Sequence, residues 1–527
     1  MALPSPFDAL RPGWTPQSVG APLRGVPDLA DMLAAGIRAG GSRPALTDRD
    51  GTHSYSELDQ AASALALELY AAGVRPGTPV VIHCPLSRWA VVAMLGVLRT
   101  GAQYVPVDAS FPVERRMAMI RESGAVVAVV DPRSRTELPP GCTFQTVIRI
   151  PTHLDGTTPA SPSRHAPDLA AYTLFTSGSS GVPKGVVVSR HSLAYSTQAR
   201  LAYYPSAPSV FLLCSSISFD SSVAGIYWAL ATGAHLVIPS PAVVDTVAIR
   251  NACQQYAASH VLLIPSLYRI LLESDEDDSL SSLRAVIVAG EACPPELVRR
   301  HFELMPDAEL YNEYGPTECT VWALVHQCQP SDGDATAVPI GRPIPGTEAY
   351  LRTDNGPAAT NEIGELWLGG PGVALGYTTE PATSRGANRL YRTGDFARLD
   401  EHGLVHYHGR RDGQLKLAGV RLELMEVEHA LSAASGGRSS AIGVVRQAGT
   451  PIALVGFVVS APGELQPVAL RRHMRGMLPH AAVPAAFCAM DQLPCLSNGK
   501  LDRRALDHMA TSHIAASSTS ALQGGTT

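Results

Sequence analysis

Short apolar segments alternate with helical patterns from about residue 54 to residue 348, and this alternation restricts the fold more than any other feature. Apolar runs of strand length lie at 79–83, 126–130, 210–213, 236–238, 261–264 and 285–288. Between such runs, apolar residues recur at helical spacing, as at 56–72, 89–99 and 112–123. Because strands that alternate with helices pair in parallel, the pattern predicts an α/β fold with sheets covered by helices.

The length and the later pattern predict at least two domains. A chain of 527 residues is too long for one hydrophobic core. After about Glu348 the pattern changes to strands with glycine-rich turns, and the charged, glycine-containing segment 409–413 marks a domain boundary. We expect a large multi-sheet N-terminal domain over 1–410 and a small α+β domain over 411–510. Residues 511–527 are rich in Ser, Thr, Ala and Gly, which predicts a disordered tail.

The charge and the cysteines restrict the partners and the compartment. The net charge of −6 gives no electrostatic reason to expect binding to nucleic acid or to an anionic membrane. The longest strongly apolar run, 89–98, is too short to cross a bilayer, and the first residues lack the pattern of a signal peptide. The nine cysteines include no C-x-x-C pair, so we expect reduced thiols in a cytoplasmic protein.

The segment 172–186 reads YTLFTSGSSGVPKGV, and its centre consists of Thr, Ser and Gly. Small residues let backbone N–H groups face outward, so such a loop can cradle a phosphate, with Lys184 as a cation for the same anion. The spacing excludes a P-loop, because Pro183 precedes the lysine and Gly185 follows it. The alternative is a polar surface loop.

The segment 312–318 reads NEYGPTE and gathers three groups suited to a nucleotide. Tyr314 can stack on a purine, Thr317 can bind a phosphate oxygen, and Glu318 can coordinate a hard cation such as Mg²⁺. The alternative is a simple Gly-Pro turn after a strand.

Three further charged residues lie in settings that need an explanation. Asp395 follows a glycine turn in YRTGD and suits the two hydroxyls of a ribose, unless it stabilises its own turn. Asp220 follows a buried apolar strand, so it requires a cation, which is either a substrate ammonium group or an internal Arg or Lys. Lys500 lies on an Asn-Gly turn near the C-terminus, where a lysine is usually only solvated.

Together these motifs identify a family. The chain resembles the adenylate-forming superfamily, and most closely the amino-acid adenylation enzymes of nonribosomal peptide synthesis. The similar segments follow one order along the chain: SYSELD at 54–59, LRTGAQYVPVD at 98–108, TSGSSGVPKG at 176–185, FDSS at 219–222, NEYGPTE at 312–318, GELWLGGPGVALGY at 364–377, YRTGD at 391–395, GRRDGQLKLAGVRLELMEVE at 409–428 and NGKLD at 498–502. Each segment is weak evidence alone, but all of them in register leave little room for chance.

The resemblance implies αβαβα-type layers in a large N-terminal domain, joined at the hinge residue Asp412 to a small, mobile C-terminal domain. It also implies that the protein uses ATP and Mg²⁺. The residues implied to bind the triphosphate are Thr176, Ser177, Gly178, Ser179, Ser180, Gly181 and Lys184. Tyr314 and Asn312 would bind adenine, Asp395 the ribose, and Arg410 the nucleotide. Thr317 would bind the α-phosphate, Glu318 would coordinate Mg²⁺, and Lys500 would form a catalytic bridge between the substrate carboxylate and the α-phosphate.

Asp220 matches the family's acid that binds the substrate amine, so the resemblance implies an amino acid substrate. The implied side-chain pocket consists of Ser221, Ala224, Leu262, Ile287, Ala289, Glu313, Val321 and Trp322. The bulk of Trp322, Leu262 and Ile287 favours a small neutral amino acid such as alanine, glycine or serine. Glu313 either pairs with a basic substrate side chain or points away, so β-, aromatic and basic amino acids stay as alternatives.

The implied reaction forms an aminoacyl-AMP and then transfers the acyl group to a phosphopantetheine thiol. After Leu506 the sequence contains no carrier segment with an attachment serine, so we expect a free-standing enzyme that loads a discrete carrier protein. An MbtH-like helper protein is a further partner that the family allows. The alternative enzyme is an acyl- or aryl-CoA ligase, and the alternative outside enzymes is a nucleotide sensor without catalysis.

One segment departs from the family pattern. The family usually reads K-[IL]-R-G, whereas this chain has Ala418 in KLAG at 416–419. The missing basic residue lies on the face that the family uses in thioester formation. We therefore expect an altered contact with the carrier rather than a loss of adenylation.

Overall fold

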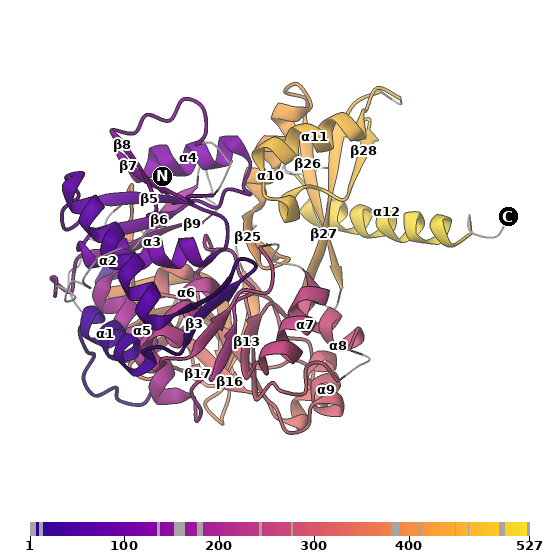
Figure 1. Cartoon of the computed structure of the whole chain (residues 1–527). Coiled ribbons are helices and arrows are strands. Elements are labelled where there is room, and N and C mark those ends of the chain that lie inside the picture. The colour runs from indigo at the N-terminus through magenta and orange to yellow at the C-terminus, as the bar shows by residue number, and fades with distance from the viewer. Residues whose placement is uncertain are drawn as a thin grey trace. The chain divides into compact units, whose positions relative to one another are not determined.

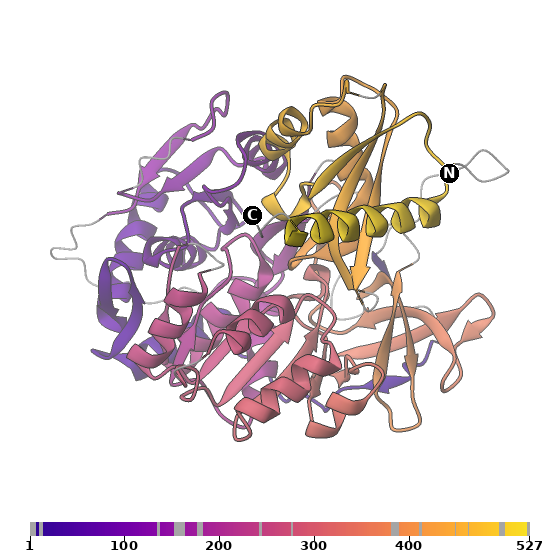
Figure 2. The same cartoon turned by 90° about the vertical axis from the view of Figure 1, so that its right-hand side faces the viewer.

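The computed structural model describes residues 7–9, 14–133, 138–151, 164–176, 183–241, 245–275, 278–380, 389–410, 414–447, 450–461, 463–494 and 501–523. The chain divides into two units, and Figures 1 and 2 trace it by colour from the N-terminus to the C-terminus. The first unit comprises 1–110, 119–176 and 184–411, and the second comprises 111–118, 177–183 and 412–527.

Two sheets with mainly parallel pairing form most of the first unit. One runs in the order β21 (Gly376–Tyr377), β10 (Lys184–Ser189), β9 (Ala170–Thr176), β6 (Gln103–Pro106), β5 (Pro79–His83), β7 (Val127–Val130) and β8 (Thr146–Arg149). The other runs in the order β17 (Arg342–Pro343), β16 (Leu324–Gln327), β15 (Glu309–Tyr314), β14 (Ala285–Ala289), β13 (His260–Leu263), β11 (Val210–Leu212), β12 (His235–Val237), β3 (Pro44–Asp48) and β4 (Gly51–Ser54).

Helices separate the strands, as the alternation predicts. They are α1 (Leu29–Gly40), α2 (Tyr55–Ala71), α3 (Arg88–Arg99), α4 (Val113–Ser123), α5 (Arg190–Tyr203), α6 (Asp220–Thr232), α7 (Thr246–Tyr256), α8 (Pro265–Glu273) and α9 (Pro295–Leu304), with short 3₁₀ turns η1 (Thr317–Cys319) and η2 (Pro330–Asp334). A capping box between Ser54 and Glu57 explains where α2 begins. The predicted α/β class with several sheets in the N-terminal part is confirmed.

A third sheet accounts for the change of pattern after Glu348. It runs in the order β1 (Phe7–Ala9), β22 (Arg389–Leu399), β20 (Ile363–Gly369), β18 (Glu348–Thr353) and β19 (Gly356–Pro357). Two further strands, β2 (Ser18–Val19) and β23 (Val405–Arg410), pair with β18 and β22. All pairings in this sheet are antiparallel, which suits strands joined by glycine-rich turns.

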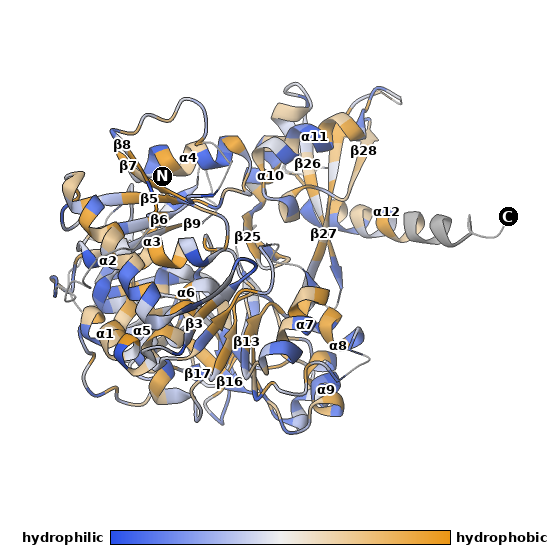
Figure 3. Cartoon of the chain, in the orientation of Figure 1, coloured by the Kyte–Doolittle hydropathy of each residue, from blue (hydrophilic) through white to orange (hydrophobic). Residues whose placement is uncertain are grey.

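The nine-stranded sheet separates two hydrophobic cores. Its register places Leu262 beside Ile287 and Ile287 beside Tyr311, and all three side chains belong to the core that contains Trp322. The residues one position earlier on these strands, 261, 286 and 310, belong to the second core. Figure 3 shows hydrophobic residues along the strands around β13. Every second side chain of these strands therefore faces the first core.

The second unit has its own core. A hairpin of β24 (Gln414–Leu417) and β25 (Val420–Glu423) is followed by a three-stranded sheet of β26 (Ser440–Gln447), β27 (Thr450–Val459) and β28 (Ala486–Met490). The helices are α10 (Leu424–Ala434), α11 (Pro467–Met477) and α12 (Arg503–Gln523), with the 3₁₀ turn η3 (His480–Ala482). Leu431 and Met474 are fully buried in a cluster that α10, α11 and the sheet share. This unit is α+β, as the sequence predicts for the C-terminal part.

The end of the chain differs from the expected disordered tail. The helix α12 continues to Gln523 and so covers most of the segment 511–527. Its first turns are anchored because Leu506 and Ala510 are buried in a cluster with strands of the three-stranded sheet. The same alanines that lower the sequence complexity also favour a helix, since alanine has the highest helix propensity. Composition alone does not predict this helix.

Membrane spans and disulfides are absent from the described ranges. None of the helices there combines the length and apolar character that crossing a bilayer requires. None of the cysteines in these ranges forms a disulfide; they lie at 84, 142, 214, 253, 293, 319, 328 and 488. Burial raises the pKa of the thiols of Cys84 and Cys214, so both are protonated.

A cavity-forming substitution can test whether the second unit has a separate hydrophobic core. Leu431→Ala removes a fully buried side chain and should destabilise this unit by about 2–5 kcal/mol. In hydrogen exchange followed by mass spectrometry, we expect faster exchange in β26 and β27 and unchanged exchange in β13 and β14. Val468→Ala on α11 is the control, because that side chain is 80% exposed. Equal acceleration in both units would contradict separate cores.

Candidate active site

The NEYGPTE segment spans the end of a strand and a short helical turn. The strand β15 carries Asn312 and Tyr314, and η1 begins at Thr317. Gly315 joins the two, and a Cβ at this position would lie 2.3 Å from the carbonyl oxygen of Val321. The close approach of two backbone segments therefore requires glycine here.

The turn after η1 has an unusual backbone. Thr320 and Val321 have φ angles of 54° and 82°, in the left-handed region that β-branched residues rarely adopt. Such strain costs on the order of 1–3 kcal/mol per residue. Hydrogen bonds hold the turn, since the Thr320 hydroxyl donates to the carbonyl of Gly372 at 2.6 Å and the Thr320 carbonyl accepts from Ser196 at 2.9 Å. The strained turn sets the positions of Val321 and the residue that follows it.

Residues from three motifs form one hydrogen-bonded group. The hydroxyl of Tyr314 donates to one carboxylate oxygen of Asp395, and Nη1 of Arg410 donates to the other at 3.0 Å. The register of β22 and β23 pairs Asp395 with Arg410, so the backbone itself brings them together. Burial and the charge of Asp395 raise the pKa of Tyr314, which stays a neutral donor. These two donors orient a carboxylate that suits a pair of hydroxyl groups.

Glu318 and Lys184 both contact Tyr377. The Tyr377 hydroxyl donates to Oε1 of Glu318 at 2.7 Å, and the ammonium group of Lys184 lies 5.4 Å from the centroid of the Tyr377 ring. β10 and β21 pair Val186 with Tyr377, which brings the lysine of the phosphate loop to this ring. Glu318 is fully buried. A carboxylate oxygen is a ligand type for Mg²⁺ and an ammonium group one for phosphate, so these residues fit both.

The remaining predicted nucleotide residues are only partly described. Nδ2 of Asn312 donates to the carbonyl of Pro339 at 2.8 Å, and Thr317 is half-buried at the start of η1. Thr176 lies directly opposite Lys184 across β9 and β10. The other predicted residues, Ser177, Gly178, Ser179, Ser180, Gly181, Asp412 and Lys500, lie outside the described residues.

The predicted amino-acid pocket draws on one core. Asp220 and Ser221 begin α6, and Ala224 follows one turn later. The side chains of Ala224, Leu262, Ile287 and Trp322 belong to this core, and Ala289 and Val321 pack against it. Burial and the charge of Asp220 raise the pKa of Tyr172, so this phenol stays neutral. The structure brings these residues together, and their role as a pocket stays a prediction.

Glu313 has an internal partner, Arg200. Nη1 and Nη2 of Arg200 donate to Oε1 and Oε2 of Glu313 at 2.6 and 2.8 Å, and the hydroxyl of Tyr204 also donates to Oε1. The side chains of Arg200 and Glu313 are each 1% exposed. A buried carboxylate needs a cation, and Arg200 supplies one within the chain. The role of Glu313 toward a substrate stays a prediction.

Sequence reasoning missed three of these residues. Tyr377 is the last residue of the segment 364–377, and its place at the end of a motif was the available signal. Arg200 and Tyr204 belong to no motif. Their only signal is a cation and a phenol at the C-terminal end of α5, and that signal does not identify Glu313 as the partner.

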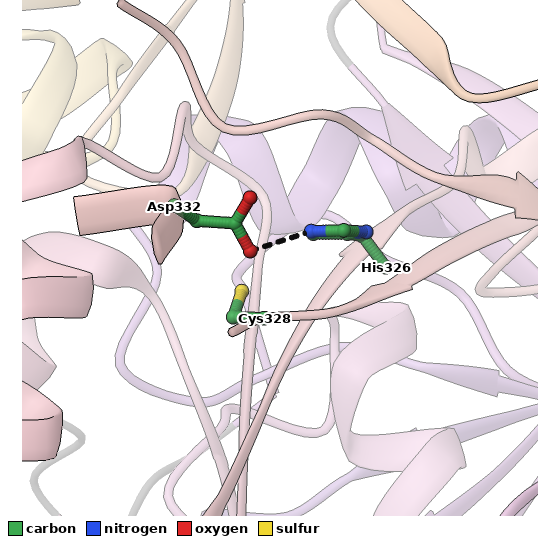
Figure 4. Close-up of side chains that lie close together, drawn as sticks. All are labelled: His326, Cys328 and Asp332. Atoms are coloured by element: carbon green, nitrogen blue, oxygen red, sulfur yellow. Dashed lines mark hydrogen bonds and ion pairs between the residues drawn. The ribbon is translucent and has the colours of Figure 1, made fainter. Parts of the chain in front are cut away.

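A separate group of possible metal ligands lies at the end of β16 (Figure 4). Within the described ranges, ligand atoms of His326, Cys328 and Asp332 lie within 4.8 Å of one another. Oδ2 of Asp332 lies 2.8 Å from Nε2 of His326 and also accepts from the backbone N–H of Gln329 at 2.7 Å. A hydrogen bond to Cys293 and burial raise the pKa of the Cys328 thiol. The Asp332 carboxylate therefore caps η2.

The chain is similar to known proteins over most of its length. Residues 34–378 match the family of AMP-binding enzymes. Novobiocin biosynthesis protein H of Streptomyces niveus is 34% identical over 505 residues, which cover 91% of this chain and 82% of that protein. The chain belongs to the AMP-binding enzyme family. These matches confirm that this AMP-binding enzyme belongs to the adenylate-forming superfamily. They also confirm its similarity to the adenylation enzymes of nonribosomal peptide synthesis.

The chain is also similar to a longer protein and to proteins of known structure. Phosphinothricin tripeptide synthetase PhsC of Streptomyces viridochromogenes is 36% identical over 474 residues, which cover 86% of this AMP-binding enzyme but 42% of PhsC. The structure of PA1221, an NRPS protein containing adenylation and PCP domains, has a TM-score of 0.78 at 28% identity and covers 91% of this chain and 84% of PA1221. The Vibrio cholerae adenylation domain AlmE shares the fold, with a TM-score of 0.79 at 24% identity.

The Tyr314 hydrogen bond should strengthen nucleotide binding. Tyr314→Phe removes a donor to the Asp395 carboxylate, and a hydrogen bond to a charged group contributes about 1.5–3 kcal/mol. We expect AMP to bind at least about tenfold more weakly in isothermal titration calorimetry. Tyr350→Phe is the matched control, because it removes a Tyr–carboxylate hydrogen bond of 2.6 Å to Glu348 in the third sheet. Equal effects of the two variants would exclude a role for Tyr314 in nucleotide binding.

The close approach at Gly315 predicts a loss of stability. The Cβ of Gly315→Ala would meet the Val321 carbonyl oxygen at 2.3 Å and the Trp322 Cα at 2.4 Å, and neither backbone atom can move freely. We expect a cost of about 1–3 kcal/mol, seen as a lower Tm. Gly476→Ala on α11 is the control, since nothing lies within 4 Å of its added Cβ. An unchanged Tm for Gly315→Ala would contradict the backbone contact.

Proposed function

We propose that this AMP-binding enzyme condenses an amino acid with ATP to form aminoacyl-AMP and pyrophosphate. The phosphopantetheine thiol of a carrier protein then attacks the acyl carbon, so that a thioester forms, AMP leaves and the thiol proton is released. The observation that carries the proposal is the group of Tyr314, Asp395 and Arg410, in which three motifs that are distant in sequence orient one carboxylate. That carboxylate suits the ribose hydroxyls of ATP, and Tyr314 supplies an aromatic surface for adenine.

The reaction has to bring two anions together. The carboxylate oxygen of the amino acid attacks the α-phosphorus, and the bond to the bridging oxygen breaks, so that pyrophosphate leaves with the electron pair. Cations must offset the like charges while they hold the reactants in line. We assign this role to Lys500, with Thr317 at the α-phosphate and Lys184 at the outer phosphates. Glu318 would hold Mg²⁺, which supplies further positive charge.

The substrate side of the proposal depends on Asp220. A carboxylate at the start of α6, beside a core of apolar side chains, supports recognition of a substrate ammonium group. Trp322, Leu262 and Ile287 are bulky and buried, which supports a small neutral amino acid such as alanine. An acyl- or aryl-CoA ligase, the second candidate, has no use for a carboxylate at this position.

Transfer to a carrier rests on relatives and on the division of the chain. PhsC is named a peptide synthetase, and PA1221 contains adenylation and PCP domains. The chain spans 42% of PhsC, so the carrier is a proposed partner, as is an MbtH-like helper. The two units divide between Arg411 and Asp412, which supports a hinge there that changes the site between the two half-reactions. Ala418, at the exposed turn between β24 and β25, is where we expect the carrier contact to differ.

ATP–pyrophosphate exchange across the proteinogenic amino acids and a set of β-amino acids tests the activity. We expect exchange with a small neutral amino acid. Asp220→Asn should lower kcat/KM by about 100-fold or more, because it removes the counterion of the substrate amine. Asp245→Asn, at the start of α7, is the control, since that carboxylate caps its own helix. Lys500→Ala should abolish exchange and leave AMP binding intact.

Two results would contradict the proposal. CoA-dependent activation of simple acids, without exchange for any amino acid, would favour the CoA ligase. AMP binding with neither activity, whether or not a carrier protein and an MbtH-like protein are added, would favour a nucleotide sensor.

A further inference from the structure

The ion pair of Arg200 and Glu313 lies on the pocket face of the nine-stranded sheet. β14 and β15 pair Ala289 with Glu313, and Ile287 is two residues from Ala289, so both strands present these side chains on one face. Leu262 lies beside Ile287 on β13. Glu313 therefore places a carboxylate on the same face as the apolar side chains of Leu262 and Ile287.

Arg200 neutralises this carboxylate with both of its terminal nitrogens. The two N–H···O distances of 2.6 and 2.8 Å form the bidentate geometry that gives arginine–carboxylate pairs their strength. Both side chains are 1% exposed, so water screens neither charge. Although burial lowers the pKa of Arg200, the charge and hydrogen bonds of Glu313 outweigh that effect and raise it, so the guanidinium stays charged.

Arg200 also holds Trp322, the largest side chain of the predicted pocket. The guanidinium carbon lies 4.3 Å from the centroid of the Trp322 ring, and Nε1 of Trp322 donates to the carbonyl of Ser196 at 3.3 Å. The ring of Tyr204, whose hydroxyl donates to Glu313, stacks on Trp322 at 5.7 Å. Since Ser196 and Arg200 both belong to α5, one helix controls the charge and the shape of this wall.

We propose that Arg200 is a specificity-determining residue, which cancels the charge of Glu313 and thereby makes the pocket select amino acids with neutral side chains. The inference rests on the proposed amino-acid adenylation. Arg200 acts through Glu313 and Trp322, so it is a positioning residue. A substrate with a cationic side chain would have to displace a bidentate internal partner and leave that partner buried and unpaired, which is strongly unfavourable.

The test measures ATP–pyrophosphate exchange with the full chain for neutral amino acids and for lysine, ornithine and arginine. For the wild type we expect exchange with a neutral amino acid only. Arg200→Met removes the cation beside the Glu313 carboxylate and leaves only the Tyr204 hydroxyl as its donor. The ratio of kcat/KM for neutral over cationic substrates should therefore fall roughly tenfold or more. Glu313→Gln leaves the guanidinium unpaired, which should raise KM for the neutral amino acid, give no activity with cations, and leave KM for ATP unchanged.

Two further variants separate selectivity from stability. The double variant Arg200→Met, Glu313→Gln removes both charges, and we expect its substrate ratio and KM to return to within roughly threefold of the wild type because the two sites are coupled. Arg88→Met breaks another buried ion pair, with Asp48, whose side chains are 6% and 4% exposed. Asp48 ends β3, which four strands separate from β15 in the same sheet. Arg88→Met should lower Tm and leave the substrate ratio unchanged.

Each outcome decides a different point. An Arg200→Met protein that folds, as judged by circular dichroism, and keeps the wild-type ratio would overturn the inference, and so would an equal change of ratio in Arg88→Met. If Arg200→Met does not fold, the comparison moves to the Glu313→Gln background, where failure of the double variant to recover KM overturns it. Absence of exchange with any amino acid in the wild type would instead contradict the proposed function.

Discussion

The strand β15 is held between a parallel neighbour, β14, and an antiparallel neighbour, β16, and the rest of the site depends on this pairing. The pairing decides which face of the sheet receives Glu313. It also ends at Tyr314, whose carbonyl accepts from the N–H of Ala323 at 2.8 Å and so closes the intervening chain into a short loop. Glu318, expected at the phosphates, and Trp322, expected at the substrate side chain, lie on that one loop. The two halves of the site are therefore linked through a few residues of backbone.

Two buried carboxylates of the first unit have the same types of hydrogen-bond donor but differ in how strongly these donors hold them. Asp395 and Glu313 each accept from a tyrosine hydroxyl and from an arginine. Arg200 directs both terminal nitrogens at Glu313, whereas Nη1 of Arg410 divides its hydrogen bonds between Asp395 and the carbonyl of Thr393. The more strongly bound carboxylate suits a structural charge, and the less strongly bound one suits exchange with ligand hydroxyls.

Local patterns in the sequence predict the elements of this fold well, and long-range pairing limits the rest. The helix expected at 56–72 is α2, and the strand expected at 79–83 is β5, because apolar periodicity is a local property. The partners Tyr314 and Asp395 are 81 positions apart, and Arg200 and Glu313 are 113 apart. Their pairing depends on the order of strands in the sheets, which no local pattern encodes. The expected roles of the nucleotide residues came from the chemistry of their motifs together with family resemblance, and the set of pocket residues came from the resemblance alone.

The left-handed backbone at Thr320 and Val321 has a consequence for engineering the pocket. Val321 carries a branched side chain at a φ of 82°, where glycine or asparagine has lower energy. Any replacement at 321 changes the conformational energy of the loop at the same time as the volume of the predicted pocket. A randomised library at this position will therefore enrich residues that relax the main chain, whatever substrate is supplied. An increase in activity from such a library therefore reflects relaxation of the loop backbone as well as any change in substrate recognition.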